Sequence, residues 1–257
     1  MTAAGRLQGK VCVVTGATGM AADAARRFAR EGADVWVVAR DRAQCEALGL
    51  PHAVADLRDE AETEAAFAAV ARAHPRIDAL YAVAGASGRP LGDGPAHQLT
   101  LDAWEGTFAL NATPAFLAAR ETLRVMLDQE PGPSATRGSL VLMSSVLADH
   151  PMPELFATHA YAAAKAATIG LVRTMAAYYG EHAIRVNALA PSLVRTPMSA
   201  RAAADAASVA AAERRQPLTR GFLEAADVTE AAVYLCSDES RAVTGQVLAV
   251  DGGWTVT

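Results

Sequence analysis

Lys10-Val-Cys-Val-Val-Thr-Gly-Ala-Thr-Gly19 is the segment that indicates the fold class most directly. The residues Lys10–Val14 form a short apolar run typical of a buried strand, and they lead directly into a glycine-rich turn and a predicted helix over Met20–Glu31. A strand, a glycine turn and a helix in this order bring backbone N–H groups and a helix N-terminus against a pyrophosphate. The stretch therefore predicts the first unit of a dinucleotide-binding α/β fold.

The rest of the chain repeats this alternation of apolar strands and helices. Strands are predicted over 34–38, 52–55, 78–85, 138–143, 184–189 and within 244–253, and helices over 59–73, 102–129, 161–179 and 224–237. No linker or charge block divides the 257 residues, so we expect one domain over 1–257. The predicted fold is α/β, with a doubly wound, Rossmann-type, mostly parallel sheet that carries helices on both faces.

Composition and charge exclude several function classes. A formal net charge of −5 and a pI near 5.7 give no electrostatic reason to expect binding to nucleic acid or to an anionic membrane. The N-terminus lacks the apolar core of a signal peptide, and no uncharged apolar run approaches the roughly eighteen residues of a membrane span, so we expect a cytoplasmic protein. Cys12, Cys45 and Cys236 lack metal-ligand spacing, and no metal site is predicted.

The segment Ser144–Lys165 carries the chemistry. Tyr161 and Lys165 are four residues apart, so on a helix they share a face. A phenol has an ordinary pKa of about 10, and a nearby ammonium favours its ionised form, which makes Tyr161 a candidate general acid or base. Ser144 and Ser145 follow a predicted strand, at the edge where open α/β sheets bind ligands, and a hydroxyl there can hydrogen-bond a substrate carbonyl. The alternative is that the serines only end the strand and that Tyr161 and Lys165 lie on the surface.

In this order the motifs resemble the short-chain dehydrogenase/reductase family, in its short single-domain branch typified by 3-oxoacyl-acyl-carrier-protein reductases. The resemblance extends from Lys10 to Trp254. Its landmarks are Thr15–Gly19, Asp56-Leu57, Ala84-Gly85, Asn111, Ser145, Tyr161 with Lys165, Asn187–Pro191, Thr196–Met198 and Thr244–Gly253.

The resemblance implies NAD(P)H-dependent interconversion of a ketone and a secondary alcohol. It assigns the carbonyl contact to Ser145, with Ser144 as the rival, and proton transfer to Tyr161. It also implies that Lys165 lowers the pKa of Tyr161 and binds the nicotinamide ribose, and that Asn111 anchors a relay water. The implied cofactor contacts are Gly16, Thr18, Gly19, Met20, Arg40, Asp56, Leu57, Ala84, Gly85, Tyr161, Lys165, Pro191, Val194 and Thr196.

The end of the second predicted strand bears on the choice of cofactor. In such enzymes an acidic side chain at this place holds the ribose hydroxyls of NAD, whereas a small residue followed by a cation suits the 2′-phosphate of NADP. Ala39-Arg40 matches the second pattern and favours NADP(H) over NAD(H). The alternative is that Arg40 is an ordinary solvated residue at the strand end and that Asp41 binds the ribose hydroxyls.

The resemblance also implies a substrate-covering segment at about 192–222 and a homodimer or homotetramer built on the helices of Asn111 and Tyr161. The chain departs from the family pattern at Ala21, which replaces the third glycine of a loop that is one residue short, and at Ala82-Val83, which replace two asparagines. Ser192 stands where the family has glycine. An alternative function is therefore a catalytically weak or silent member that serves as a partner subunit or ligand-binding protein.

Overall fold

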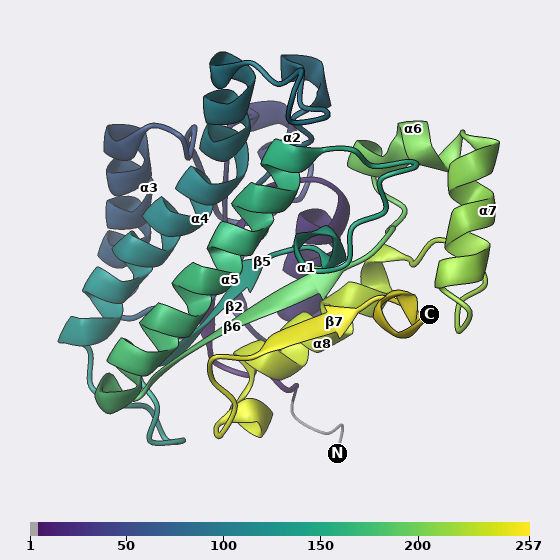
Figure 1. Ribbon diagram of the computed structural model, residues 1–257. Coiled ribbons are helices and arrows are strands. Elements are labelled where there is room, and N and C mark those ends of the chain that lie inside the picture. Colours follow the sequence, from purple (N-terminus) through teal and green to yellow (C-terminus); the bar gives the residue numbers. More distant parts are fainter. Residues whose placement is uncertain (1–4) are drawn as a thin grey trace.

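The computed structural model describes residues 5–257 and is built on a seven-stranded sheet in which neighbouring strands are parallel (Figure 1). The strands are β1 (Val11–Thr15), β2 (Asp34–Ala39), β3 (His52–Val54), β4 (Ala79–Ala82), β5 (Gly138–Met143), β6 (Ile184–Pro191) and β7 (Val247–Val250). Their order across the sheet is β3-β2-β1-β4-β5-β6-β7. The doubly wound prediction is confirmed, and the reversal of strand order places a ligand crevice at the carboxyl ends of β1 and β4.

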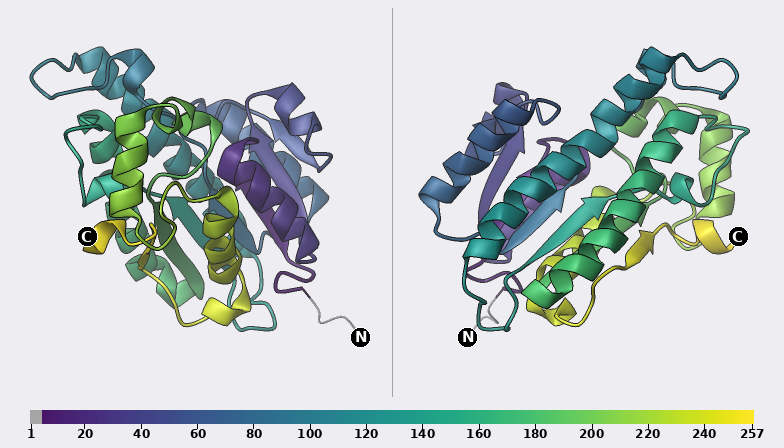
Figure 2. Two further views of the ribbon diagram at one scale, coloured as in Figure 1. Left: turned by 90° about the vertical axis from the view of Figure 1, so that its right-hand side faces the viewer. Right: turned by 60° about the vertical axis from the view of Figure 1, so that its left-hand side comes forward.

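Helices cover both faces of the sheet (Figure 1; Figure 2). One face carries α3 (Glu60–Ala73), α4 (Leu101–Asp128) and α5 (His159–Tyr179), and the other carries α1 (Gly19–Arg30) and α8 (Ala225–Cys236). The short helix α2 (Arg42–Glu46) follows β2, while α6 (Ala200–Ala203) and α7 (Ala206–Arg215) stand beyond the end of the sheet. Single 3-10 turns are η1 (Arg89–Leu91), η2 (Val146–Ala148), η3 (Gly180–His182), η4 (Pro197–Ser199), η5 (Asp238–Ser240) and η6 (Trp254–Val256).

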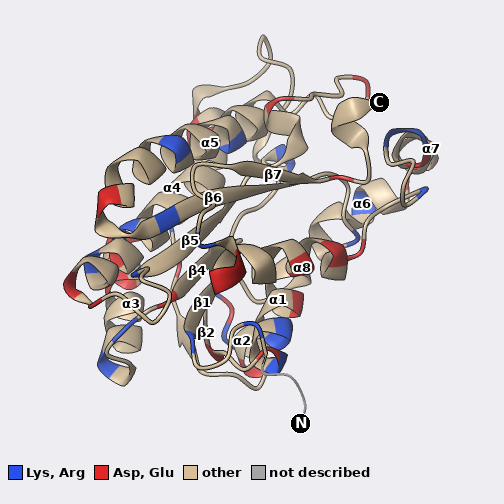
Figure 3. Ribbon diagram, turned by 90° about the horizontal axis from the view of Figure 1, so that it is seen from below, with Lys and Arg blue, Asp and Glu red and all other residues tan. Residues whose placement is uncertain are grey.

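Two apolar cores separate the sheet from its helices. Successive side chains of a strand point to opposite faces, so Val14 packs in the core with Phe28 of α1, whereas Val13 packs in the core with Phe67 of α3. Strands β5 and β6 are buried along their whole length, which explains why β5 reads as a largely apolar run instead of an alternating pattern. Charged side chains lie mainly on the helices and loops outside these cores (Figure 3). No helix within residues 5–257 combines the length and the apolar character that crossing a membrane requires.

The carboxyl ends of β1 and β4 are joined by one hydroxyl. Thr15 Oγ1 accepts hydrogen bonds from the backbone N–H groups of Val83 and Ala84, both at 3.0 Å. These two bonds hold the glycine turn after β1 beside the chain that leaves β4. The hydroxyl of Thr15 therefore fixes the backbone after β4 at the crevice, and this contact does not require the two asparagines that are absent from this chain.

Candidate active site

Two adjoining pockets open along the carboxyl edge of the sheet. The first has a volume of about 170 Å³ and surrounds Tyr161, and the second has a volume of about 200 Å³ and follows the glycine turn. Gly85, just after β4, lines both pockets. They therefore meet at the switch point of the sheet, where a dinucleotide in such a fold crosses from one half to the other.

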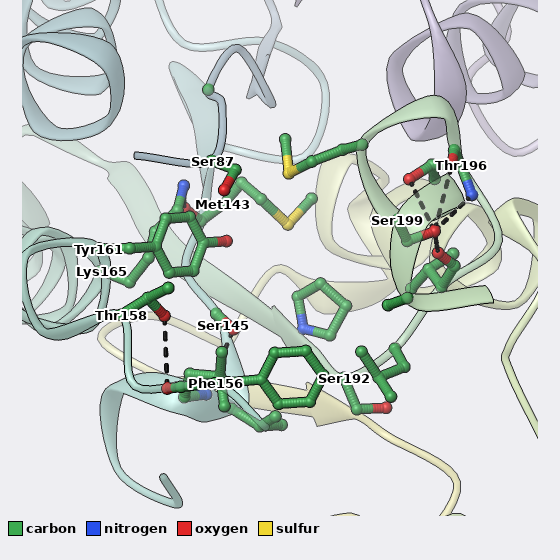
Figure 4. Close-up of a pocket in the computed structure, with 18 of the residues that line it drawn as sticks. Ser87, Met143, Ser145, Phe156, Thr158, Tyr161, Lys165, Ser192, Thr196 and Ser199 are labelled. Atoms are coloured by element: carbon green, nitrogen blue, oxygen red, sulfur yellow. Dashed lines mark hydrogen bonds between the residues drawn. The ribbon is translucent and has the colours of Figure 1, made fainter. Parts of the chain in front are cut away.

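Tyr161 and Lys165 project from the first turns of α5 into the first pocket (Figure 4). The Lys165 Nζ atom lies 5.6 Å from the centroid of the Tyr161 ring and donates a hydrogen bond to the carbonyl of Met143 at 3.0 Å. Lys165 is only 3% exposed. The predicted shared helix face is present, and the ammonium is also tied to the end of β5.

The structure distinguishes the two serines that follow β5. The Ser144 hydroxyl donates to the backbone carbonyl of Lys165 at 2.9 Å, so it ties the strand end to α5. The Ser145 hydroxyl accepts the N–H of Leu147 at 3.2 Å at the start of η2, and it lies on the same side of the pocket as Tyr161 (Figure 4). Ser145 is thus the better placed of the two to meet a substrate oxygen.

Burial controls the pKa values of the Tyr161–Lys165 pair. Burial raises the pKa of Tyr161 to about 12, and the hydroxyl of Ser145 acts in the opposite direction. Burial also lowers the pKa of Lys165 to about 8. In the protein alone the pKa of Tyr161 therefore lies above its ordinary value, and the Lys165 ammonium bonds the carbonyl of Met143 instead of the phenol. The effect of Lys165 on the pKa of Tyr161 stays a prediction.

Asn111 lies inside α4 and is 1% exposed. Its Nδ2 donates to the carbonyls of Ala86 and Thr107, both at 2.9 Å, whereas its Oδ1 is buried without a hydrogen-bond partner among the described residues. A Cβ built on Gly85 would lie 2.9 Å from this Oδ1 and 3.4 Å from Lys165 Nζ. The absent side chain of Gly85 therefore leaves space next to an unsatisfied acceptor and a buried ammonium, which suits a bridging water.

Asp93 fixes the start of the helix that carries Tyr161. It is 6% exposed, and its two carboxylate oxygens accept the backbone N–H groups of Ala160 at 2.9 Å and Tyr161 at 3.0 Å. The first N–H groups of a helix have no partner within the helix. A carboxylate at this end accepts hydrogen bonds from them, and its negative charge interacts favourably with the positive end of the helix dipole. The loop between β4 and α4 thus positions the backbone of Tyr161.

Replacing Asp93 with alanine should affect both stability and turnover. We expect Asp93→Ala to lower the free energy of unfolding by about 1–2 kcal/mol, the usual cost of losing a helix cap, and to lower kcat because Tyr161 loses its backbone anchor. Urea denaturation and steady-state kinetics measure the two effects. Asp59→Ala is the matched control, since Asp59 caps the distant helix α3 through the N–H of Glu62. Full kcat in Asp93→Ala would remove Asp93 from this role.

The glycine turn forms an open cradle despite its short length. Gly16 and Gly19 have φ of 95° and 54°, in the left-handed region that favours glycine, and α1 begins at Gly19. Ala21 is 2% exposed and lies in the core between α1 and the sheet, so its Cβ points away from the groove. A Cβ on Gly16 would approach that of Ala21 to 3.2 Å. The substitution of the third glycine therefore fills the core beneath the turn and leaves the phosphate side free.

The far end of the groove carries two arginines. Arg40 follows β2, and Arg58 donates from Nε to an oxygen of Asp56 at 2.9 Å. Hydrogen bonds from Arg58 and the charge of Arg40 lower the pKa of Asp56, against the effect of its burial. Asp41 accepts the N–H of Gln44 at 3.0 Å as the cap of α2. Arg58 is a groove residue that sequence reasoning missed.

The predicted cofactor residues divide between the two pockets. The groove is lined by Gly16, Thr18, Arg40, Asp56, Leu57, Ala84 and Gly85, and the first pocket by Met20, Gly85, Tyr161, Lys165, Pro191, Val194 and Thr196. Gly19 lines neither, because it packs beneath the covering segment, and a Cβ there would lie 3.1 Å from Cβ of Thr196. Asn111 also lines neither, and its Oδ1 faces the space beside Gly85. The turn formed by Gly16 and Gly19, the groove beside it and the buried ammonium of Lys165 together fit a nicotinamide dinucleotide.

The remaining wall of the first pocket was not predicted. Trp254 is 2% exposed, lines the pocket and packs with Met152 of the loop between β5 and α5. Phe156 of the same loop is also part of the wall. Figure 4 shows Thr196, one of the predicted cofactor contacts, and Ser199, both from the segment after β6, across the pocket from Tyr161. Trp254, Phe156 and Ser199 join the pocket only in three dimensions, so no local pattern identifies them.

The segment after β6 leaves and rejoins the sheet domain at one place. Gln216 is fully buried; its Oε1 accepts the N–H of Leu193 at 3.1 Å and its Nε2 donates to the carbonyl of Gly221 at 2.7 Å. Val194 and Leu223 form a parallel bridge beside it. Between these ends lie η4, α6 and α7, of which η4 and α6 contribute side chains to the pocket lining. In the described part of the chain, no group of three His, Cys, Asp or Glu side chains is arranged to hold a metal ion.

Comparisons with known proteins agree with this geometry. A model of the family described as enoyl-(acyl carrier protein) reductase matches residues 14–255. Short-chain dehydrogenase reductase 3a of Arabidopsis thaliana is 34% identical over 264 residues, which cover 98% of this chain and 97% of the relative. The 3beta-hydroxysteroid dehydrogenase 1 of Eggerthella lenta is 35% identical over 263 residues, covering 97% of this chain and 95% of that protein.

A solved structure extends the likeness to three dimensions. The gluconate 5-dehydrogenase of Burkholderia cenocepacia J2315, in complex with NADP and tartrate, matches with a TM-score of 0.87 at 27% identity and covers 98% of this chain and 97% of that chain. The family predicted from the sequence is thus confirmed over nearly the whole length. The chain belongs to the short-chain dehydrogenase/reductase family, whose members are oxidoreductases.

Proposed function

We propose that this protein interconverts a ketone and a secondary alcohol with NAD(P)H as the redox partner. One observation carries the proposal: Ser145, Tyr161 and Lys165 line one pocket that joins, at Gly85, the groove of the glycine turn. When bound, the nicotinamide supplies or accepts the hydride. A catalytically silent member that only binds a ligand has no need of Ser145, Tyr161 and Lys165 in one pocket. That alternative function was suggested mainly by the short glycine turn, and the turn is open in the structure.

Each side chain has a distinct task in reduction. The Ser145 hydroxyl donates a hydrogen bond to the substrate carbonyl oxygen, and Tyr161 transfers its phenolic proton to the same oxygen. The high pKa of Tyr161 keeps the phenol protonated at neutral pH, ready to act as the acid. Lys165 stabilises the phenolate that remains, and a water held by Asn111 Oδ1 returns the proton from solvent. In alcohol oxidation the same groups act in reverse.

Reduction should depend on pH through Lys165. Since burial lowers the pKa of Lys165 to about 8, its ammonium is present below that pH and is lost above it. We expect kcat/KM for carbonyl reduction to be level at neutral pH and to fall above about pH 8, because a neutral amine no longer stabilises the phenolate. Lys165→Arg keeps its positive charge at this pH, so the residual kcat/KM of this variant should not fall above about pH 8. If kcat/KM fell with the same midpoint pH in both proteins, the pH dependence would belong to another group.

We further propose NADP(H) as the preferred cofactor. Arg40 lies at the end of the groove, and Asp41, the acidic group that would hold a ribose diol, is engaged as the cap of α2. The gluconate 5-dehydrogenase matched above is described with NADP. Titration with NADPH and with NADH, followed by nucleotide fluorescence, tests cofactor binding directly. Oxidation of bound NADPH by a panel of ketones then tests turnover.

Self-association through α4 and α5 is a related proposal. The outer side of α4 exposes Phe116, and α5 exposes Tyr178 at 67% of its surface near its end and the small residues Ala166, Ala167 and Gly170 in its first half. Small residues let two helices approach closely, and exposed aromatic side chains are stabilised when a partner subunit buries them. A homodimer or homotetramer therefore fits this surface. Light scattering on the full chain measures the assembly.

A further inference from the structure

The first pocket carries two arginines that the proposed chemistry does not use. Arg89 belongs to η1, in the loop after β4, and Arg201 belongs to α6, in the covering segment. Both line the same pocket as Tyr161 although 112 positions of sequence separate them, from 89 to 201. Two cationic side chains from distant segments thus line one cavity on a protein whose net charge is −5.

Neither arginine is neutralised by a carboxylate. Within residues 5–257, neither guanidinium forms an ion pair with Asp or Glu at 4.0 Å or less. Arg89 donates from Nη2 to the carbonyl of Leu155 at 2.8 Å, which aims the guanidinium but does not offset its charge. Burial, followed by the charge of Arg201, lowers the pKa of Arg89, which agrees with the place of both residues in one pocket lining.

The acidic groups near this pair are already engaged. The charge of Asp93 acts on Arg89, but both oxygens of Asp93 accept backbone N–H groups at the start of α5. Hydrogen bonds from Ser208 and, to a smaller extent, the charge of Arg201 lower the pKa of Asp205, whose Oδ2 accepts both the N–H and the hydroxyl of Ser208. The carboxylates of Asp93 and Asp205 offset part of the positive charge from a distance, but neither pairs directly with a guanidinium. An anion that bonds both arginines would therefore further lower the cost of placing two cations at one pocket.

The rest of the wall shows what the anion would belong to. Apolar side chains form much of the pocket, among them Val146, Leu147, Phe156, Leu193, Met198 and Trp254. These apolar side chains suit the hydrocarbon part of a ligand, whereas the two guanidinium groups suit a carboxylate, to which each can form paired hydrogen bonds. With a volume of about 170 Å³, the pocket suits a small molecule.

We infer that Arg89 and Arg201 form an anion subsite, and that the substrate is a small oxo acid or hydroxy acid whose carboxylate they bind while its carbonyl or hydroxyl faces Ser145 and Tyr161. This inference rests on the proposed oxidoreductase function and names its substrate class. A carboxylate bound to both arginines would also link the loop after β4 to α6. The anion would thereby draw the covering segment toward the body of the protein over the reacting carbonyl.

The test compares acids with their uncharged esters. Straight-chain oxohexanoates with the carbonyl at each position from C2 to C5, and the corresponding methyl esters, are titrated calorimetrically into the protein saturated with NADP, which cannot reduce them. Oxidation of NADPH by the same compounds is followed separately. We expect at least one acid to bind tenfold or more tighter than its ester, as roughly one charge-assisted contact implies. In Arg201→Gln and Arg89→Gln this preference should fall below about threefold. The affinity for the ester should remain unchanged.

Controls separate the subsite from the fold and from the redox proposal. Arg201 is exposed and its side chain makes no hydrogen bond to the described residues, so Arg201→Gln leaves the fold intact even where Arg89→Gln disturbs the contact with Leu155. Arg214→Gln, on α7 and outside the pocket lining, should keep the preference for the acid. Acid binding that depends on the arginines without NADPH oxidation would contradict the redox function and leave the subsite standing. Equal binding of acids and esters, no binding of either, or an acid preference that persists in the double variant would overturn the subsite.

Discussion

Tyr161→Phe should reduce kcat for carbonyl reduction by about 10²–10⁴-fold, the contribution usual for a positioned general acid. The substitution removes only the phenolic oxygen, and the ring remains beside Lys165, whose ammonium lies 5.6 Å from its centroid. The carbonyl oxygen then has Ser145 as a hydrogen-bond donor but no group that gives up a proton. Nucleotide affinity, measured by fluorescence titration, should change little, because the glycine turn and the groove are untouched.

The matched control is Tyr178→Phe. Tyr178 lies on the same helix but is 67% exposed, so the loss of its hydroxyl should leave kcat and nucleotide binding as they are. Single-turnover rates with saturating nucleotide isolate the chemical step from product release. If Tyr161→Phe retained the parent rate in that measurement, the proton donor would have to be another group. Ser145 would be the first alternative.

Arg40→Asp should reverse the choice of cofactor. The arginine follows β2 at the far end of the groove, and an aspartate in its place would repel a 2′-phosphate and accept hydrogen bonds from a ribose diol. We expect the ratio of kcat/KM for NADPH to that for NADH to fall by about 100-fold or more, because charge-assisted hydrogen bonds are lost for one nucleotide and gained for the other. Steady-state kinetics with both nucleotides give the ratio directly.

Arg42→Asp is the control for general electrostatics. Arg42 lies two residues further along, in α2, and is not part of the groove lining, so the same change of charge there should move the ratio only slightly. The ratio for Arg40→Asp should also approach that of the parent as salt concentration rises, since screening weakens both effects. An unaltered ratio at low salt would leave the phosphate to Arg58 or show that the chain does not distinguish the nucleotides.

The elements predicted best are those with an unambiguous local pattern. Strand β5 over 138–143 matches its predicted range, and the long helix predicted over 102–129 is α4, Leu101–Asp128. Strand β6 continues to Pro191, two residues beyond the predicted end, because its pairing with β7 extends it. Helix α2 was not predicted, since five residues capped by Asp41 are too short to show a helical period.

Most of the predicted site residues line the two pockets, but the sequence does not predict the electrostatics of the site. A spacing of four residues brings Tyr161 and Lys165 onto one face, but it carries no information on burial, and burial sets both pKa values in this structure. Trp254 and Arg201 come from distant segments, and no neighbouring residue marks either as part of a pocket. Arg58 is the exception, because a cation two residues after Asp56 could have been recognised as a groove residue once Asp56 was placed there.

The hydrogen bonds of Gln216 have a consequence for how this architecture diversifies. Because they join the two ends of the segment between Leu193 and Leu223, insertions or deletions inside it leave β6 and α8 where they are. Doubling the length of a flexible loop costs only about 0.6 kcal/mol in closure entropy. Evolution, or an engineer grafting a foreign sequence between these two anchors, can therefore change what the enzyme accepts without redesigning the scaffold that folds it.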